Sequence, residues 1–88
     1  MEVIKKDGRV QPLEKSKIKV SILNAAADTE VILNEADINL IVDDVVKNIE
    51  HLRSQYGNTS SFEINGSVID ILKREGFSEI INKYIGFN

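Results

Sequence analysis

The sequence predicts a mostly helical α+β domain: a four-helix bundle with an N-terminal β-hairpin or small three-stranded sheet covering one end. Apolar residues recur at helical spacing in four separate stretches, and two short apolar-polar runs flank Asp7-Gly8 near the N-terminus. No Gly/Ser/Pro-rich linker or internal repeat divides the chain, so residues 1–88 are expected to form one domain.

The N-terminal segment, residues 3–10, is predicted to form the hairpin, with Asp7-Gly8 taking the positive φ angles of a tight turn. Pro12 cannot donate a ladder hydrogen bond, and it pushes Gln11 toward an extended conformation. The second strand is therefore expected to stop there, and the chain to turn into a helix.

Basic residues gather around this junction. Lys5 and Lys6 lie in the hairpin, and Lys17 lies near the start of the following helix. Because a helix start carries unpaired N–H groups and a partial positive charge, this arrangement could hold phosphate. Lysines on an edge hairpin also protect against strand-to-strand aggregation, and the residues alone leave that alternative open.

The first helix is expected from Glu14 or Lys15 to about Asp28, and residues 31–33 are then expected to form an apolar link that fills the core. The apolar positions of the helix are Ile18, Ile22, Ala25 and Ala26, broadened by Val20 and Leu23.

The second helix is expected to be the longest, with Asn34 as its N-cap and its end before Gly57. Its predicted buried stripe is Ile38, Ile41, Val42, Val45, Ile49 and Leu52. Asp43 and Asp44 are neighbours in the sequence, and neighbouring side chains on a helix point about 100° apart. The two carboxylates are therefore expected on a solvated helix face and not in a paired metal or acid–base site. His51, the sole histidine, has no second histidine or cysteine to complete a metal site.

The last third of the chain predicts two more helices. Residues 60–63, Ser-Ser-Phe-Glu, match a capping box, and a short third strand is expected through Thr59. The third helix ends before Gly76, and its apolar face is Ile64, Val68, Ile71 and Leu72. The fourth helix is capped by Ser78 and carries Ile80, Ile81, Tyr84 and Ile85. Gly66 interrupts the third helix, either because of a close backbone or ligand contact or through simple tolerance.

The charge is uneven along the chain. The formal net charge is −3, yet residues 1–19 hold six basic and three acidic residues, which leaves +3 there and −6 in the remainder. An acidic body with one basic end suits a small polyanion better than a long nucleic-acid duplex, although ordinary scatter of surface charge is the alternative. With no cysteine, no signal-like segment and no membrane-length apolar run, the protein is expected in the cytoplasm.

A family resemblance adds to this interpretation. Residues 5–9, Lys-Lys-Asp-Gly-Arg, then Pro12-Leu13, Lys17-Ile18 and residues 24–27 resemble the opening of an ATP-cone, the adenine-nucleotide regulatory domain of ribonucleotide reductases and of their transcriptional repressor. The second half is similar to the closing helix pair of that family, through Glu63-Ile64, Val68, Leu72, residues 75–77 and residues 83–85.

The resemblance implies a set of site residues in this chain. The triphosphate would contact Lys5, Lys6 and Lys17. Adenine would lie between the hairpin and the first helix, with Gln11 and Glu14 reading the base and Val3, Leu13, Ile18 and Ile64 around the ring. Ser61 and Asn65 would contact the sugar. No catalytic or metal-ligating residue is implied, and the sequence contains no Walker-type phosphate loop.

The function implied by the resemblance is allosteric regulation. ATP or dATP, with Mg²⁺, would bind without being hydrolysed, and the partner would be a ribonucleotide reductase catalytic domain or other ATP-cones in a homo-oligomer. A second hypothesis is an interaction or oligomerisation module with a degenerate nucleotide site, which Gln11 and Asn65 favour. A third, a small DNA-binding helical domain, requires a basic recognition helix, and none of the four predicted helices is clearly basic, except the first.

Overall fold

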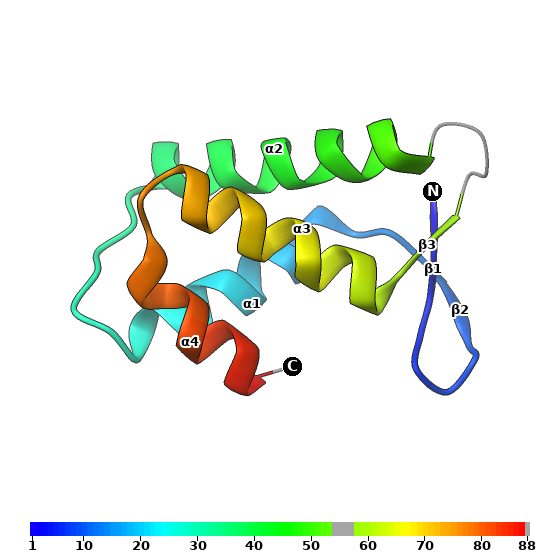
Figure 1. Cartoon of the computed structure of the whole chain (residues 1–88), viewed down its shortest axis with the longest axis horizontal. Coiled ribbons are helices and arrows are strands. Elements are labelled where there is room, and N and C mark those ends of the chain that lie inside the picture. The colour runs from blue at the N-terminus through cyan, green and yellow to red at the C-terminus, as the bar shows by residue number, and fades with distance from the viewer. Residues whose placement is uncertain (54–57, 88) are drawn as a thin grey trace.

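The computed structural model describes residues 1–53 and 58–87, which form four helices packed around one apolar core and a sheet at one end (Figure 1). In chain order the elements are β1 (Glu2–Ile4), β2 (Val10–Pro12), α1 (Lys15–Ala27), α2 (Glu35–Arg53), β3 (Asn58–Ser60), α3 (Ser61–Arg74) and α4 (Ser78–Phe87). The predicted fold class is confirmed.

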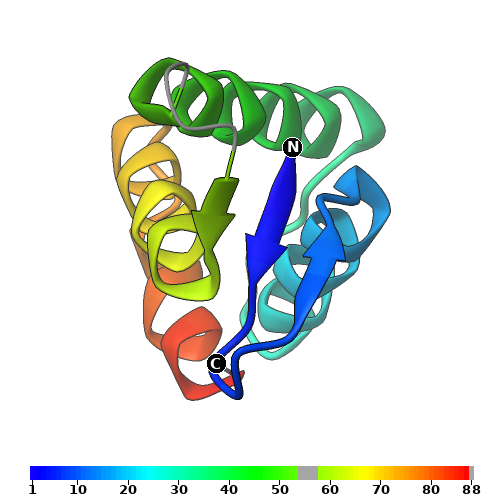
Figure 2. The same ribbon diagram turned by 90° about the vertical axis from the view of Figure 1, so that its right-hand side faces the viewer.

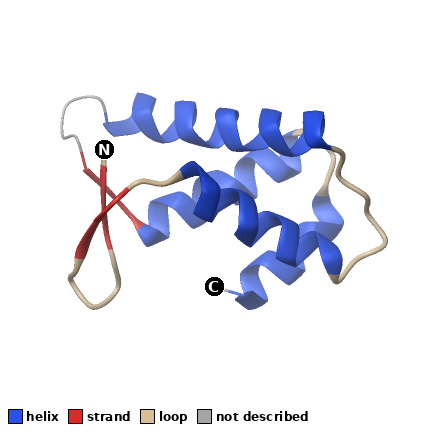
Figure 3. Cartoon of the chain, turned by 180° about the vertical axis from the view of Figure 1, so that it is seen from behind, coloured by secondary structure: helices blue, strands red, loops and turns tan. Residues whose placement is uncertain are grey.

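The sheet joins the N-terminus to the middle of the chain. Its strand order is β2-β1-β3, with β1 antiparallel to β2 and parallel to β3. Val3, at the centre of β1, is paired with Gln11 on one side and with Thr59 on the other. The expected third strand is therefore confirmed, and Figure 3 shows the three short strands together at one end of the bundle.

The hairpin loop differs from the prediction in one detail. The Gly8 N–H donates to the Lys5 carbonyl at 2.9 Å, and the Lys5 N–H donates to the Arg9 carbonyl at 2.7 Å. Gly8 has a φ of +88°, but Asp7 does not take a positive φ, so the prediction for Asp7 was wrong. The loop is a three-residue connection closed by a left-handed glycine. Asp7 contributes instead through its side chain, whose Oδ1 accepts from the Arg9 N–H at 3.1 Å.

The four helices surround the core in the order α1, α2, α3, α4, and α4 closes back onto α1 (Figure 2). The core contains most of the predicted apolar face of each helix. Its most deeply buried large residues are Ile22, Ile38, Ile41, Ile49, Leu72, Ile80 and Tyr84. None of the helices in the described ranges has the length and apolarity needed to cross a bilayer.

Four apolar residues expected to pack inward are instead exposed, and one of them is Ile85, which is 55% exposed in α4. Val20 is 54% exposed because it lies about 200° around α1 from both Ile18 and Ile22. Leu52 is 58% exposed, in the last turn of α2. Ile32 is 89% exposed at the middle of the link, whereas its neighbours Val31 and Leu33 pack against the core as expected.

Capping side chains begin two of the helices as predicted. Asn34 Oδ1 accepts from the Asp37 N–H at 2.8 Å, and Ser60 Oγ accepts from the Glu63 N–H at 3.2 Å. α4 begins at Ser78 itself, one residue earlier than expected. The predicted stop of α2 before Gly57 lies outside the described residues.

The two glycines of the α3 region predict opposite effects of substitution by alanine. A Cβ added at Gly66 would meet no heavy atom within 4 Å, which favours tolerance over a close protein contact as the reason for that glycine. Gly66→Ala should raise the free energy of unfolding by about 0.5–1 kcal/mol, because alanine loses less backbone entropy in a helix. Gly76, at φ +84°, is the matched control, and Gly76→Ala should lower the free energy of unfolding by about 1 kcal/mol. Urea denaturation measures both, and a destabilised Gly66→Ala variant would contradict this interpretation.

Candidate functional site

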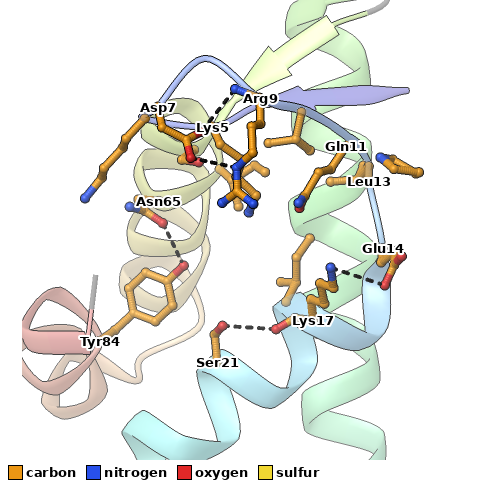
Figure 4. Close-up of a pocket in the computed structure, with 16 residues that line it drawn as sticks. Lys5, Asp7, Arg9, Gln11, Leu13, Glu14, Lys17, Ser21, Asn65 and Tyr84 are labelled. Carbon is orange, nitrogen blue, oxygen red and sulfur yellow. Dashed lines mark hydrogen bonds and ion pairs between the residues drawn. The ribbon is translucent and has the colours of Figure 1, made fainter.

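A cavity of about 420 Å³ opens between the hairpin, the start of α1 and the facing sides of α3 and α4 (Figure 4). Its volume falls within the range of about 300–1,000 Å³ that is common for small-molecule sites. The cavity is built from both ends of the chain, because β1 holds the hairpin beside the start of α3.

All of the residues that sequence analysis proposed for a ligand line this cavity. They are Lys5, Lys6 and Lys17 for phosphate, Val3, Gln11, Leu13, Glu14, Ile18 and Ile64 for the base, and Ser61 and Asn65 for the sugar. The structure brings these side chains together, while their individual contacts with a ligand stay predictions.

The hairpin supplies one wall through the alternation of a β-strand. Val3 is paired with Gln11, and the next residue on the same face, Lys5, bonds to Arg9 through its backbone. Successive side chains of a strand point to opposite faces, so these four project to the same side. All four line the cavity.

The cavity is locally positive in an acidic chain. Its lining includes four basic residues and two acidic residues, a formal charge of +2, whereas the whole chain carries −3. The two carboxylates are each paired with a cation: Arg9 Nε lies 2.6 Å from Asp7 Oδ2, and Lys17 Nζ lies 3.8 Å from Glu14 Oε2. Exposed pairs of this kind contribute only about 0–1 kcal/mol, so an anionic ligand could compete for either cation at little cost.

Apolar side chains line the same cavity as the basic residues. Ile18 is buried in α1, and Leu13 and Ile64 are half-buried beside it. Phe62 is exposed and does not line the cavity, but its ring centre lies 5.8 Å from Nζ of the lining residue Lys6. The cavity therefore combines a cationic edge with an apolar surface, which suits an anion that carries a flat ring.

A tyrosine from α4 completes the side of the cavity opposite Lys17 (Figure 4). Tyr84 is almost fully buried, and its hydroxyl donates to Asn65 Oδ1 at 3.1 Å. Burial raises the pKa of the Tyr84 phenol to about 12, because the charged form would lose its hydration. The hydroxyl therefore stays protonated throughout the physiological pH range.

Sequence reasoning missed five lining residues: Asp7, Arg9, Pro12, Ser21 and Tyr84. Arg9 could have been found, because strand alternation places it on the face that carries Gln11. Ser21 could also have been found, since it follows Lys17 by one helical turn and donates to the Lys17 carbonyl at 3.0 Å. Tyr84 had no comparable signal, because only the packing of α4 brings it to a cavity formed mainly by the first half of the chain.

The acidic pair on α2 has structural partners outside this cavity. Asp43 Oδ1 lies 3.3 Å from Lys15 Nζ, and Asp44 Oδ2 lies 3.1 Å from Arg74 Nη2. Asp44 is partly buried, so the expectation that both lie largely in solvent was wrong for that residue. Among residues 1–53 and 58–87 no group of three or more metal-ligating side chains comes together.

The fold and the cavity together define a small domain suited to bind an anionic ligand with an aromatic ring. A family model of the ATP cone domain matches residues 1–87, and the chain therefore belongs to the ATP cone family. ATP cone domains bind adenine nucleotides and have a regulatory role. A search of curated proteins found no match to this chain.

The raised pKa of Tyr84 predicts how alkaline pH affects stability. The phenol of the unfolded chain ionises near pH 10, whereas in the folded chain it stays neutral until about pH 12. The stability linked to this group is complete below pH 10 and is lost as the pH rises toward 12. The melting temperature of the wild-type chain should therefore fall more steeply over this interval than that of Tyr84→Phe. Thermal unfolding followed by circular dichroism measures the difference, and parallel curves would contradict it.

Proposed function

We propose that this chain binds ATP or dATP in the cavity and acts as an allosteric regulatory domain of a ribonucleotide reductase. The observation that carries the proposal is the meeting of a cationic edge and an apolar wall in one cavity of a chain that belongs to the ATP cone family. A nucleotide offers both a charged triphosphate for the cations and a flat base for the apolar side chains.

The triphosphate end of the nucleotide is assigned to Lys5, Lys6 and Lys17. Two of these lysines come from the hairpin and one from the first turn of α1, so they approach the cavity from different elements. Lysine acts as a point charge and tolerates varied phosphate poses. The nucleotide is proposed to bind with Mg²⁺, carried by the phosphates themselves.

The base and sugar are assigned to the other lining residues of the cavity. Gln11 offers both a donor and an acceptor, and the Glu14 carboxylate can accept from the exocyclic amine of adenine. The ring would lie against Val3, Leu13, Ile18 and Ile64, and the sugar would face Ser61 and Asn65.

The cavity is suited to binding the nucleotide without hydrolysing it. A carboxylate that activates water for attack must be available to accept a proton. In the proposed pose Glu14 is engaged by the base, and Asp7 is paired with Arg9, which has no assigned phosphate role. Their role is proposed to be the placement of cations and the reading of the base.

Nucleotide binding would have a regulatory effect because one nucleotide contacts four elements of the fold. The nucleotide would join the hairpin, α1, α3 and α4, and a partner that prefers the joined arrangement would then be favoured. The proposed partner is the catalytic domain of the reductase or another ATP-cone in a homo-oligomer.

The phosphate assignment is tested by calorimetric titration with ATP and dATP in Mg²⁺. The wild-type chain should bind with a saturable micromolar dissociation constant. Lys5→Ala/Lys17→Ala should weaken binding by about a hundredfold or more, because two charge-assisted contacts are lost. Lys47→Ala/Lys83→Ala, which removes two exposed lysines away from the cavity, is the charge-matched control and should bind like the wild type. Equal weakening in the two double variants would overturn the assignment.

The base assignment predicts a preference for adenine over guanine. Glu14 would accept from the amine of adenine, whereas guanine would place a carbonyl oxygen opposite the carboxylate. The wild-type chain should therefore bind ATP about tenfold more tightly than GTP. Glu14→Gln, whose amide can turn to face either base, should reduce this ratio, as competition titrations would show. An unchanged ratio in the variant would remove Glu14 from the base site.

The alternative function, an interaction module with a degenerate site, has some support in exposed apolar side chains. Leu40 on α2 and Ile85 on α4 are each more than half exposed. However, α2 and α4 lie diagonally across the bundle, so these side chains do not form one continuous surface (Figure 2). A module of this kind would self-associate without nucleotide, which light scattering of the purified chain would detect.

A further inference from the structure

The bond between Tyr84 and Asn65 does more than fasten α4 to α3. We propose that Tyr84 is a positioning residue that fixes the side-chain amide of Asn65 so that its NH₂ group donates to a sugar hydroxyl of the bound nucleotide. This inference rests on the proposed function and gives a role in the site to a residue that the family resemblance did not assign to it.

The geometry begins with the hydroxyl of Tyr84. It donates to Asn65 Oδ1 at 3.1 Å, and the rest of the tyrosine is almost fully buried. A buried ring in a packed core has little freedom to change its position. The hydroxyl is therefore presented to Asn65 from a fixed point in the cavity wall.

The chemical consequence concerns which end of the amide remains for a ligand. An asparagine side chain has an acceptor oxygen and a donor NH₂ group, and rotation by 180° exchanges them. Because the oxygen is engaged by Tyr84, the NH₂ group is the end available to the cavity. The lining would otherwise present either a donor or an acceptor at this position.

Protonation of Tyr84 keeps this arrangement constant. Burial holds the pKa of the phenol near 12, so the hydroxyl remains a donor across the range in which the protein works. In the described part of the chain, no hydrogen bond joins the Asn65 side chain to another ionisable side chain. The amide orientation is thus set by one neutral hydrogen bond.

The ligand group that fits a fixed donor is a hydroxyl oxygen. Asn65 lies on α3 one helical turn after Ser61, and both line the cavity on the side facing α1. A sugar hydroxyl can accept from the amide through a lone pair while donating to another partner. Fixing the amide in advance also removes the cost of ordering it when the nucleotide binds.

The test is a double-mutant cycle measured with three nucleotides. Tyr84→Phe removes only the hydroxyl, and Asn65→Ala removes the amide. The double variant combines the two substitutions in one chain. Each is titrated with ATP, dATP and 3′-deoxy-ATP. Tyr84→Phe should weaken ATP binding by about three- to tenfold, since a positioned hydrogen bond is lost. One of the two deoxy nucleotides lacks the hydroxyl that Asn65 contacts. That nucleotide should bind to Tyr84→Phe and to the wild-type chain equally well.

The cycle also separates positioning from a general structural effect. In the Asn65→Ala background, Tyr84→Phe should cause no further loss, because there is no amide left to orient. Ser21→Ala is the matched control: it also removes a hydroxyl from the cavity wall, but that hydroxyl bonds to a backbone carbonyl. Its effect should be equal for all three nucleotides.

Three results would overturn the inference. The first is a Tyr84→Phe loss of the same size for ATP and both deoxy nucleotides, and the second is the same loss in the Asn65→Ala background. The third is no loss at all. If the wild-type chain binds none of the three nucleotides, the proposed function fails, and the inference fails with it. Binding by the wild type together with any of the first three results rejects the inference alone.

Discussion

The parallel pairing of β1 with β3 is the contact on which the site depends. Three residues at the start of the chain, Glu2–Ile4, pair with the three residues Asn58–Ser60 that come directly before α3. Without this pairing the hairpin would be attached to the bundle only through α1, and the lysines of the hairpin would have no fixed distance from Ser61 and Asn65. The sheet is small, but it converts two distant segments into facing walls of one cavity. It also explains why a short chain can present a ligand with groups from four different elements.

The charges of the chain are distributed so that the same cavity is locally positive. The body of the domain is acidic, and four of the six basic residues near the N-terminus are brought to the cavity by the hairpin and the first turn of α1. A small anion is therefore attracted to one end of a protein that would repel a long polyanion elsewhere. The pairs Asp7–Arg9 and Glu14–Lys17 are exposed and weak, so they hold the cations near the cavity without blocking exchange for a ligand. In the proposed function, nucleotide binding would draw the hairpin, α1, α3 and α4 together, and a partner domain would detect that change.

Local sequence signals predicted most of this fold, because helical periodicity and capping depend on neighbouring residues. The helices, the hairpin and the third strand were predicted, and Asn34 and Ser60 cap as their sequence positions indicated. One error has a tertiary cause: Leu52 is apolar and correctly spaced, yet it is exposed in the last turn of α2. The error at Val20 is local, because its angular position on α1 points away from Ile18 and Ile22. The site residues were proposed mainly through family resemblance, and the structure places them around one cavity. Tyr84 was missed as a lining residue because its approach to Asn65 depends on how α4 packs, which no local pattern encodes.

The central claim is that one nucleotide contacts both halves of the chain, and an amide-resolved NMR titration with ATP tests it most directly. The account predicts saturable shifts in three separate segments, namely residues 5–13, residues 17–21 and residues 61–65, all with the same midpoint. The outer face of α2, around Lys47, should stay unchanged and serve as the internal reference. Shifts confined to the hairpin, or the absence of any saturable change, would contradict a site built across the β1–β3 pairing.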